Sequence, residues 1–501
     1  MSRRPLFPRP TSRPLRPASV QGPSSFQGPS SSRGTSAARR PLPAGPLPLA
    51  LLAAAVLTGL TGCSSAGASA GGGVEVVVGY QSKTINTVTA GTLLRARGYF
   101  EQQLAAEGKK NGRTYKVSWQ DYDSGAPITA QMLADKTDIG SMGDYPLLIN
   151  GSRAQEAGGA GTRMISVTGY NELGALNSVV VPNGSPAHTL ADLKGRKVST
   201  SVGSAADGTL VQALRKAGVQ DTEISKQNQQ PAIGASALKA GSVDALAQFV
   251  AWPGQVVFGG DARLLYDGAA LARPTLHGVV VRQKYATEHP EVIEAFLRAQ
   301  ADATRYLNEQ PLAASQEVAA ATGLAPEVVH LYNGPNGIAT FGLPLRPELL
   351  AALREDVPFL KSVGVLKALD LDSFVDPSYL AKAALPEIAP ARITGTDAVC
   401  GQPVTDPAKA GEIWFDGEDR TRPAATPACL LKAVKAAAGK KVRAAYVPDA
   451  TTGTRWFADK DHWAQDGADL LPFTTEDGLK AYLAAHPGAK QIGYEQALAA
   501  S

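Results

Sequence analysis

Cysteine and acidic residues are scarce in this sequence, and their absence restricts what the protein can be. The 501-residue chain has three cysteines, and none of them lies between residues 74 and 398. No acidic residue precedes Glu75, whereas eight arginines precede Cys63. Removing those eight positive charges from the formal net charge of +4 leaves −4. The rest of the chain therefore lacks the excess positive charge typical of nucleic-acid binding, and we expect no nucleic-acid partner.

Common catalytic motifs are also missing from residues 74–398. This stretch contains no Walker-type phosphate loop and no Gly-x-Ser-x-Gly turn. Its four histidines, His188, His277, His289 and His330, show no paired spacing of the kind that metal ligands need. We therefore expect neither an enzyme nor a bound cofactor.

A short apolar run follows the arginine-rich leader. Residues 47–57 are uncharged and consist mainly of Leu, Ala and Val, and Leu60-Thr-Gly-Cys63 comes after them. A positive flank, a short apolar run and a small-residue cleavage site are typical of a secretory signal. A membrane span would need about 20 apolar residues. The alternative is an uncleaved anchor helix with a chance cysteine.

The Leu-Thr-Gly-Cys ending resembles the bacterial lipobox, whose cysteine becomes lipidated. We expect residues 1–62 to be a signal peptide with a long basic leader. Cys63 would carry the lipid that anchors the protein to the outer face of the bacterial cytoplasmic membrane. Residues 63–73, rich in Ser, Ala and Gly, would form a flexible tether.

From Val74 onward, short apolar runs alternate with amphipathic stretches. We expect strands at residues 74–80, 115–119, 137–140, 176–181, 197–200, 243–249 and 277–281. Helices are expected at 89–104, 128–134, 189–195 and 209–217, and then at 291–307, 311–322, 326–331 and 347–363. Strands separated by helices predict parallel βαβ units covered on both faces. Two α/β lobes followed by a helical return predict a bilobed fold with a ligand cleft between the lobes.

Several short motifs stand in a specific order within residues 76–380. They are Val78-Gly-Tyr-Gln81, Tyr122-Asp-Ser-Gly-Ala126, Asp138-Ile-Gly-Ser-Met-Gly-Asp-Tyr-Pro146 and Gly203-Ser-Ala-Ala-Asp-Gly208. This order resembles the ABC-importer binding proteins for taurine, aliphatic sulfonates and nitrate. The resemblance implies an extracytoplasmic, periplasmic-binding-protein-like fold of type II that delivers its solute to an ABC transporter permease. Lobe 1 would comprise residues 74–178 and 275–383, and lobe 2 residues 179–274.

The resemblance also implies a cleft built from loops at strand ends. The ligand-binding residues would be Gln81, Gly143, Asp144, Tyr145, Ser201, Gly203, Ser204, Ala205, Trp252 and Pro253. Hydroxyls and free N–H groups at helix starts can hold a sulfonate without an arginine, and Trp252 could cover an apolar tail. Asp144 would repel a sulfonate but attract the ammonium group of a zwitterion. Three of these residues have a structural alternative: Gln81 could cap a turn, Trp252 could lie in the lobe core, and Asp144 could cap the helix near Pro146.

Two prolines in residues 384–393 predict a linker, and residues 394–501 are long enough for a small α+β domain. Strands are expected at 413–417, 442–447 and 455–457, and helices at 429–438 and 476–485. The motifs Cys400-Gly-Gln-Pro-Val404, Tyr446-Val-Pro-Asp449 and Gly453-Thr-Arg-Trp-Phe-Ala-Asp459 resemble the copper-binding lipoprotein accessory family of nitrous-oxide reductase. That family has a methionine where this chain has Gln402.

The two cysteines of this segment allow two interpretations. Outside the cytoplasm, two cysteines in a small module usually pair, so we expect a Cys400–Cys429 disulfide. The alternative is a copper site formed by Cys400, Cys429 and His462, in a protein that binds or delivers copper.

Overall fold

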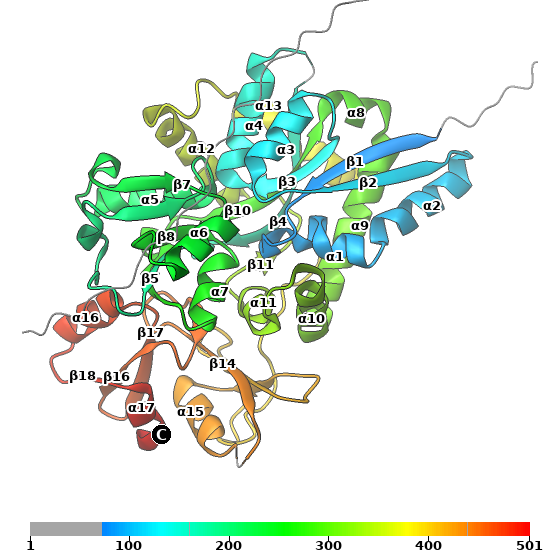
Figure 1. Ribbon diagram of the computed structural model, residues 1–501. Coiled ribbons are helices and arrows are strands. Elements are labelled where there is room, and N and C mark those ends of the chain that lie inside the picture. Colours follow the sequence, from blue (N-terminus) through cyan, green and yellow to red (C-terminus); the bar gives the residue numbers. More distant parts are fainter. Residues whose placement is uncertain (1–72, 160, 438) are drawn as a thin grey trace, which may run out of the picture. The chain divides into compact units, whose positions relative to one another are not determined.

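The computed structural model describes residues 73–159, 161–437 and 439–501 (Figure 1). By their contacts these residues belong to one compact unit. The predicted signal peptide and Cys63 lie outside the described residues. Among residues that are described, none of the helices is both long enough and apolar enough to cross a bilayer.

A six-stranded sheet forms lobe 1, with the order β11-β4-β10-β3-β1-β2. Strand β1 runs parallel to β2 and β3, whereas β10 runs antiparallel to β3 and β4. The strands are β1 (Val74–Tyr80), β2 (Tyr115–Asp121), β3 (Ile139–Gly143), β4 (Thr162–Asn171), β10 (Thr275–Arg282) and β11 (Thr340–Phe341). Its first helices are η1 (Ile85–Ala90), α1 (Thr92–Ala96), α2 (Tyr99–Asn111), α3 (Gly125–Leu133) and α4 (Asp144–Glu156).

A five-stranded sheet with the order β7-β6-β8-β5-β9 forms lobe 2. Strand β6 is parallel to β7 and β8, and β5 is antiparallel to β8 and β9, which repeats the pattern of lobe 1. The strands are β5 (Asn177–Pro182), β6 (Lys197–Thr200), β7 (Ser225–Asn228), β8 (Ala245–Phe249) and β9 (Ala262–Asp267). The helices are η2 (Leu190–Leu193), α5 (Ala205–Lys216), η3 (Asp221–Glu223), α6 (Pro231–Lys239), α7 (Trp252–Phe258) and η4 (Gly268–Leu271).

The chain passes between the two sheets twice, after β4 and after β9, so the two lobes are joined by two crossover segments. A helical return follows on lobe 1. It comprises α8 (Gln283–Glu288), α9 (Pro290–Glu309), α10 (Pro311–Thr322), α11 (Pro326–Asn333), α12 (Pro347–Ser362), α13 (Leu371–Phe374) and α14 (Ser378–Ala383). The single helix predicted at residues 89–104 is wrong. Gly98 has φ +63°, a left-handed conformation that suits glycine, and it separates α1 from α2.

Residues 394–501, the C-terminal segment, form two antiparallel sheets, β13-β12-β14-β15 and β17-β16-β18. The strands are β12 (Gly411–Phe415), β13 (Arg422–Ala424), β14 (Val442–Pro448), β15 (Arg455–Phe457), β16 (His462–Asp466), β17 (Asp469–Phe473) and β18 (Lys490–Ile492). The helices are α15 (Pro427–Lys435), α16 (Glu476–Ala485) and α17 (Tyr494–Ala500). Figure 1 shows β14 near α7 and α11, and Tyr446, Trp456 and Phe457 share one apolar core with Val256 and Val328.

A buried polar network joins the C-terminal segment to α11. The Glu412 carboxylate accepts hydrogen bonds from Arg455 and from Thr421, and it lies 3.2 Å from Nε2 of His330. Arg443 pairs with Glu327, whose carbonyl oxygen accepts a hydrogen bond from Tyr446 Oη at 2.9 Å. Because a buried charge is costly without its partner, these contacts make the segment and α11 depend on each other.

Candidate functional site

The two lobes meet where helix α4 of lobe 1 and helix α5 of lobe 2 begin. A Cβ placed on Gly143, the last residue of β3, would lie 3.5 Å from Cβ of Ala205, the first residue of α5. The ring of Tyr145 lies against Gly208, and Gln212 of α5 donates a hydrogen bond to the Tyr145 hydroxyl. The structure therefore brings the predicted residues Gly143, Tyr145 and Ala205 together across the lobe junction.

Buried polar side chains stand at the strand ends on both sides of this junction. In lobe 1, Gln81 follows β1, and its Nε2 donates to the carbonyl oxygen of Ser141 in β3 at 3.0 Å. In lobe 2, Nε2 of Gln248 in β8 donates to Ser201 Oγ at 3.0 Å, just beyond β6. Ser141 Oγ, Gln248 Oε1 and Thr200 Oγ1 are buried and have no hydrogen-bond partner among the described residues. Buried polar atoms are normally paired, so these three atoms are candidates for contact with a ligand.

His277 is a residue of this site that the sequence did not reveal. It lies in β10, and its Nδ1 is 2.6 Å from Nδ2 of Asn86. A Cβ placed on Gly143 would come 3.0 Å from Nε2 of His277, so the ring fills the space beside the junction. Burial lowers the pKa of His277 to about 3, and the imidazole is therefore neutral at physiological pH. The only sequence signal was its position inside a predicted strand.

Asp144 is the first residue of α4, and its carboxylate oxygens accept hydrogen bonds from backbone N–H groups. Its Oδ1 accepts from Tyr145 N at 2.8 Å, and its Oδ2 accepts from Leu276 N at 3.3 Å. Burial raises the pKa of Asp144 and also that of Asp356, where the nearby charge of Asp144 adds to the rise. The two carboxyl groups line a cavity of about 10 Å³ beside Arg273, which is about the room that one water needs.

Several polar groups at the start of α5 already form hydrogen bonds within the protein. Gly203, with φ +81°, donates its N–H to Asp207 Oδ2 at 3.0 Å. Ser204 is the N-cap, and its Oγ accepts from Asp207 N at 3.3 Å. Ser201 Oγ donates to the carbonyl oxygen of Gln229 at 2.9 Å. A ligand here would meet the Ser204 hydroxyl and the positive end of the α5 dipole rather than a full set of free N–H groups.

Trp252 and Pro253 open α7 at the far end of β8. The half-buried Trp252 ring has the ammonium group of Lys83 over it, 6.0 Å from the ring centroid. Lys83 comes from the loop after β1, so this contact also crosses from lobe 1 to lobe 2. Lys83 is the second residue that the sequence did not reveal, although it follows the predicted Gln81 by only two positions.

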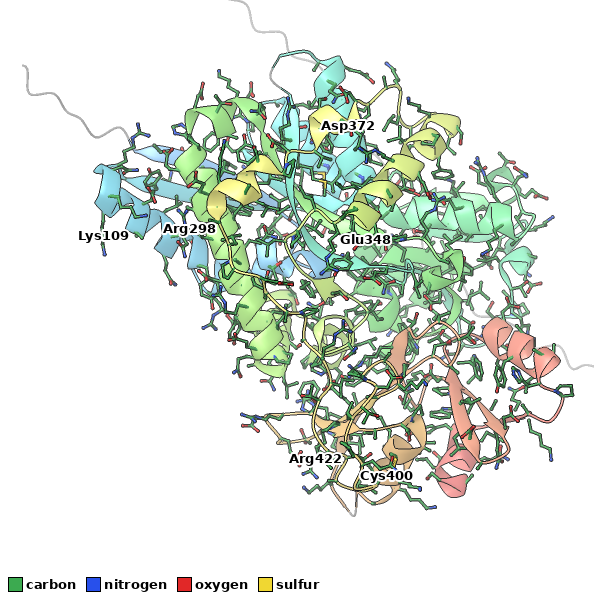
Figure 2. All side chains as sticks on the ribbon, turned by 180° about the vertical axis from the view of Figure 1, so that it is seen from behind. Lys109, Arg298, Glu348, Asp372, Cys400 and Arg422 are labelled. Atoms are coloured by element: carbon green, nitrogen blue, oxygen red, sulfur yellow. A yellow bond between two sulfur atoms is a disulfide. The ribbon has the colours of Figure 1, made fainter. Side chains whose placement is uncertain are left out.

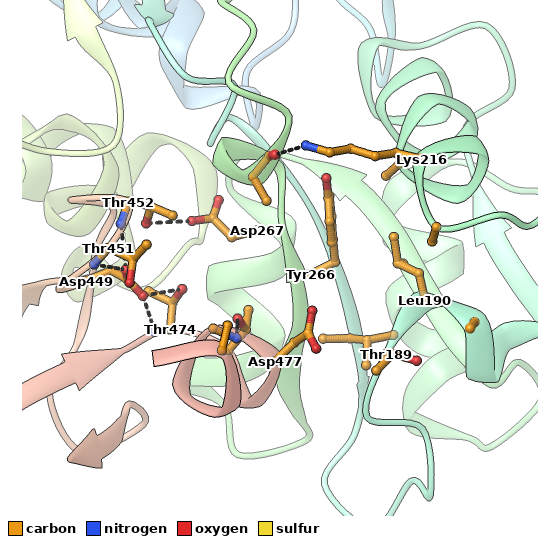
Figure 3. A pocket seen from close by; sticks show the side chains of 18 residues that line it. Thr189, Leu190, Lys216, Tyr266, Asp267, Asp449, Thr451, Thr452, Thr474 and Asp477 are labelled. Atoms are coloured by element: carbon orange, nitrogen blue, oxygen red, sulfur yellow. Dashed lines mark hydrogen bonds between the residues drawn. The ribbon is translucent and has the colours of Figure 1, made fainter. Parts of the chain in front are cut away.

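A separate cavity of about 540 Å³ lies between lobe 2 and the C-terminal segment (Figure 3). Figure 3 shows Tyr266 and Leu190 on one side and Asp449 and Thr452 on the other. None of the ten predicted ligand residues lines it. The carboxylate of Asp449 already accepts hydrogen bonds from Thr451 N, Thr452 N and Thr474 N. The Asp449 carboxylate therefore connects the turn at residues 449–452 to the end of β17.

Cys400 and Cys429 form a disulfide in the C-terminal segment (Figure 2). Both sulfur atoms lie within 4.8 Å of the Asp397 carboxylate, and His462 is not part of that group. Asp397 is buried, and it accepts hydrogen bonds from the N–H groups of Val399, Cys400 and Ala425. The carboxylate thus fixes the loop that carries Cys400. His462, the third residue of the copper alternative, lies in β16.

Ser315, His330 and Glu412 are arranged in the order of a catalytic triad. Ser315 Oγ is 3.5 Å from His330 Nδ1, and His330 Nε2 is 3.2 Å from Glu412 Oε2. All three side chains are buried, and Ser315 Oγ donates to the carbonyl oxygen of Pro311 at 2.7 Å. A nucleophile needs access to its substrate, so this arrangement is structural.

Comparisons with known proteins agree with the bilobed architecture. The NMT1/THI5 like family model matches residues 153–314. A protein of Escherichia coli (strain K12) named for binding aliphatic sulfonates is 29% identical over 280 residues, which are 55% of this chain and 81% of that protein. The taurine-binding periplasmic protein of the same organism is 25% identical over 247 residues, which are 48% of this chain and 71% of that protein.

The solved structure of the alkanesulfonate-binding protein SsuA from Xanthomonas axonopodis pv. citri, bound to MOPS, matches with a TM-score of 0.51 at 24% identity. The match covers 60% of this chain and 98% of that one. The fold is that of a periplasmic binding protein, which confirms the predicted fold class. All three of these similar proteins carry the names of binding proteins.

Proposed function

We propose that the two lobes bind a small anionic or zwitterionic solute of the sulfonate class, such as taurine, an alkyl sulfonate or nitrate, and deliver it to the permease of an ABC importer. The observation that carries this proposal is the set of buried, unpartnered polar atoms in strands β3, β6 and β8 of the two lobes, Ser141 Oγ, Thr200 Oγ1 and Gln248 Oε1. A buried polar group without a partner costs about 1–3 kcal/mol. A bound solute would remove that cost.

The chemistry of these atoms suits a sulfonate that also carries an amine. The hydroxyls of Ser141 and Thr200 can donate to sulfonate oxygens, and Gln248 Oε1 can accept from an ammonium group. Positive charge comes from Lys83 at the edge of the junction and from the N-terminus of α5. The Trp252 ring offers an apolar surface for the carbon chain of the solute. The names of the relatives, which refer to taurine and to aliphatic sulfonates, support the same class of solute.

We propose that the chain is not an enzyme, since the similar proteins carry the names of binding proteins. We also propose that it works outside the cytoplasm, anchored by a lipid on Cys63. Support for this location comes from the apolar run and Leu-Thr-Gly-Cys ending of the sequence and from the periplasmic relative.

Calorimetric titration with taurine, ethanesulfonate and nitrate tests the proposal directly. Saturable binding of at least one of them is expected. Asp144→Asn should weaken taurine more than ethanesulfonate if the carboxylate attracts the ammonium group, and equally if it serves only the N–H groups of Tyr145 and Leu276. Failure of all three solutes while a cationic or wholly apolar solute binds would overturn the proposed class.

A further inference from the structure

A second cavity, of about 330 Å³, lies where lobe 1, the linker and the C-terminal segment meet. On the lobe 1 side it is lined by Tyr170 at the end of β4, by Glu172 just after β4, and by Arg346 just before α12. Arg392 of the linker and the loop that ends at Arg455 line the other side. None of the residues of the proposed solute site lines it. Its volume lies within the range of about 300–1,000 Å³ that small-molecule sites occupy.

Two of the arginines that line this cavity donate no hydrogen bond to a carboxylate in the described part of the chain. The Arg346 guanidinium lies over the Tyr170 ring, 5.3 Å from its centroid, and its nearest carboxylate, that of Glu348, is 3.9 Å away. Arg392 has neither an ion pair nor a hydrogen bond within the described part of the chain. Burial raises the pKa of Tyr170; the charges of Glu172 and Glu348 add to that rise, and the charges of Arg346 and Arg392 oppose it. Arg346 thus lies over the Tyr170 ring, and Arg392 lines the same cavity.

The backbone fixes Arg392 in this position. Asn336 donates its N–H to the carbonyl oxygen of Ala391 at 3.2 Å, and its Oδ1 accepts from Ile393 N at 2.8 Å. These two bonds hold the linker on either side of Arg392. Arg455, which also lines the cavity, is different because Glu412 and the carbonyl oxygen of Pro335 occupy its guanidinium.

We propose that this cavity binds a small organic anion through a carboxylate or phosphate group held between Arg346 and Arg392. The planar guanidinium presents paired N–H donors that match the oxygens of such groups, and the Tyr170 hydroxyl can add a third donor. The prolines at 390, 407 and 448 give the cavity apolar walls for the organic part of the ligand. Glu172 on the rim repels an anion, and Glu348 lies 3.9 Å from Arg346, so Arg392 is the arginine without a carboxylate partner in the described part of the chain.

Titrations of the full chain at constant ionic strength test this site. The ionic strength is held constant because salt alone weakens any arginine–anion contact. The probes are inorganic phosphate, glycerol 3-phosphate and citrate. We expect at least one probe to bind with a stoichiometry of one. The double variant Arg346→Gln/Arg392→Gln should lose affinity by about tenfold or more. Glu172→Gln should bind more tightly than wild type, and Arg420→Gln, an exposed arginine outside the cavity, should be unchanged.

Three outcomes would overturn the proposal. One is the absence of saturable binding of every probe at millimolar concentration. Another is binding that the double variant and Glu172→Gln leave unaltered. The third is co-sedimentation with phosphatidylglycerol vesicles that requires both arginines while no soluble probe binds, which would assign the arginines to a lipid headgroup. An unchanged midpoint of thermal unfolding shows that the double variant is folded, and this control does not depend on the proposed solute site.

Discussion

The ring of Tyr145 occupies the space that a side chain on Gly208 would need. A Cβ at Gly208 would lie 1.3 Å from Cε2 of Tyr145, far closer than two carbon atoms can approach. Tyr145 belongs to α4 of lobe 1 and Gly208 to α5 of lobe 2. The absence of a side chain at Gly208 therefore allows the lobes to pack in the arrangement that forms the proposed site.

Gly208→Ala should weaken solute binding by more than about tenfold without unfolding the protein. Alanine favours a helix over glycine by about 0.5–1 kcal/mol, so α5 itself should not be destabilised. The midpoint of thermal unfolding and the affinity from calorimetry check the two parts separately. Adding Tyr145→Ala removes the clashing ring and should restore part of the affinity. A single variant with wild-type affinity would show that the lobes need not pack this closely.

Lys83→Met should reduce the affinity for an alkyl sulfonate by about 3- to 10-fold, because one exposed charge contributes up to about 1 kcal/mol. The variant should also show a weaker dependence of affinity on salt concentration. Lys136→Met, which removes the same charge from an exposed loop residue, is the control. If both substitutions act equally, only the overall charge of the protein matters.

Glu412→Gln should destabilise the protein by about 3–5 kcal/mol at neutral pH, because it leaves Arg455 buried without its counter-charge. Burial acts to raise the pKa of Glu412, but Arg455 and then His330 outweigh it and lower the pKa from 4.5 to about 2. Since the folded-state pKa is below the unfolded value, ionised Glu412 stabilises the protein above pH 4.5. That contribution is lost as the pH falls from 4.5 towards 2.

Thermal unfolding between pH 2.5 and pH 7 measures this pH dependence. The wild type and Glu412→Gln should differ most at pH 5–7 and converge near pH 2.5. Glu495→Gln, an exposed residue of α17, should follow the wild type throughout. A constant difference between wild type and Glu412→Gln at every pH would rule out the ionic role.

Protein exported to the cell surface should contain no free thiol in Cys400 or Cys429. The two cysteines are 29 residues apart. Reduction of the disulfide should therefore destabilise the protein by about 3–4 kcal/mol, the chain-entropy value for a loop of this length. Thiol counting in unfolded, unreduced protein measures this. Two free thiols together with cuprous binding that Cys400→Ser abolishes would favour the copper interpretation instead.

Cys63 should be the lipid-modified N-terminus of the mature protein. The Leu-Thr-Gly-Cys ending behind an apolar run predicts it, and a diacylglyceryl group gives a more stable anchor than one acyl chain. Mass spectrometry of the membrane fraction checks this directly, with Cys63→Ala as the unanchored control. An intact leader, or an unmodified Cys63 in secreted material, contradicts it.

Local patterns allowed much of the fold to be predicted. The boundaries of β1, α10 and β15 match the predicted ranges because apolar runs, prolines and glycines punctuate the chain there. Strands β4 and β9 were not predicted, although β4 is ten residues long and β9 is six residues long. Gly98 falls inside a predicted helix, because sequence alone does not show that a glycine takes a positive φ.

The site was harder to predict than the fold. Gly143, Tyr145 and Ala205 were expected at strand ends, and the structure brings them together. His277 and Lys83 were missed, since their roles arise from contacts with Asn86 and Trp252 that are 191 and 169 positions away in the chain. The pairing of His330 with Glu412 likewise joins residues 82 positions apart. Such distant polar contacts leave no periodic pattern in the sequence.

The apolar core shared by α7, α11 and β14–β15 makes the two lobes and the C-terminal segment unfold together. Val328 and Val329 of α11 are fully buried, and the rings of Phe258 in α7 and Phe457 in β15 lie 5.2 Å apart. A chain ending at residue 393 would expose this apolar surface to water, and would leave His330 without its partner Glu412. Heating should therefore give a single calorimetric transition for residues 74–501 instead of one peak for each sheet.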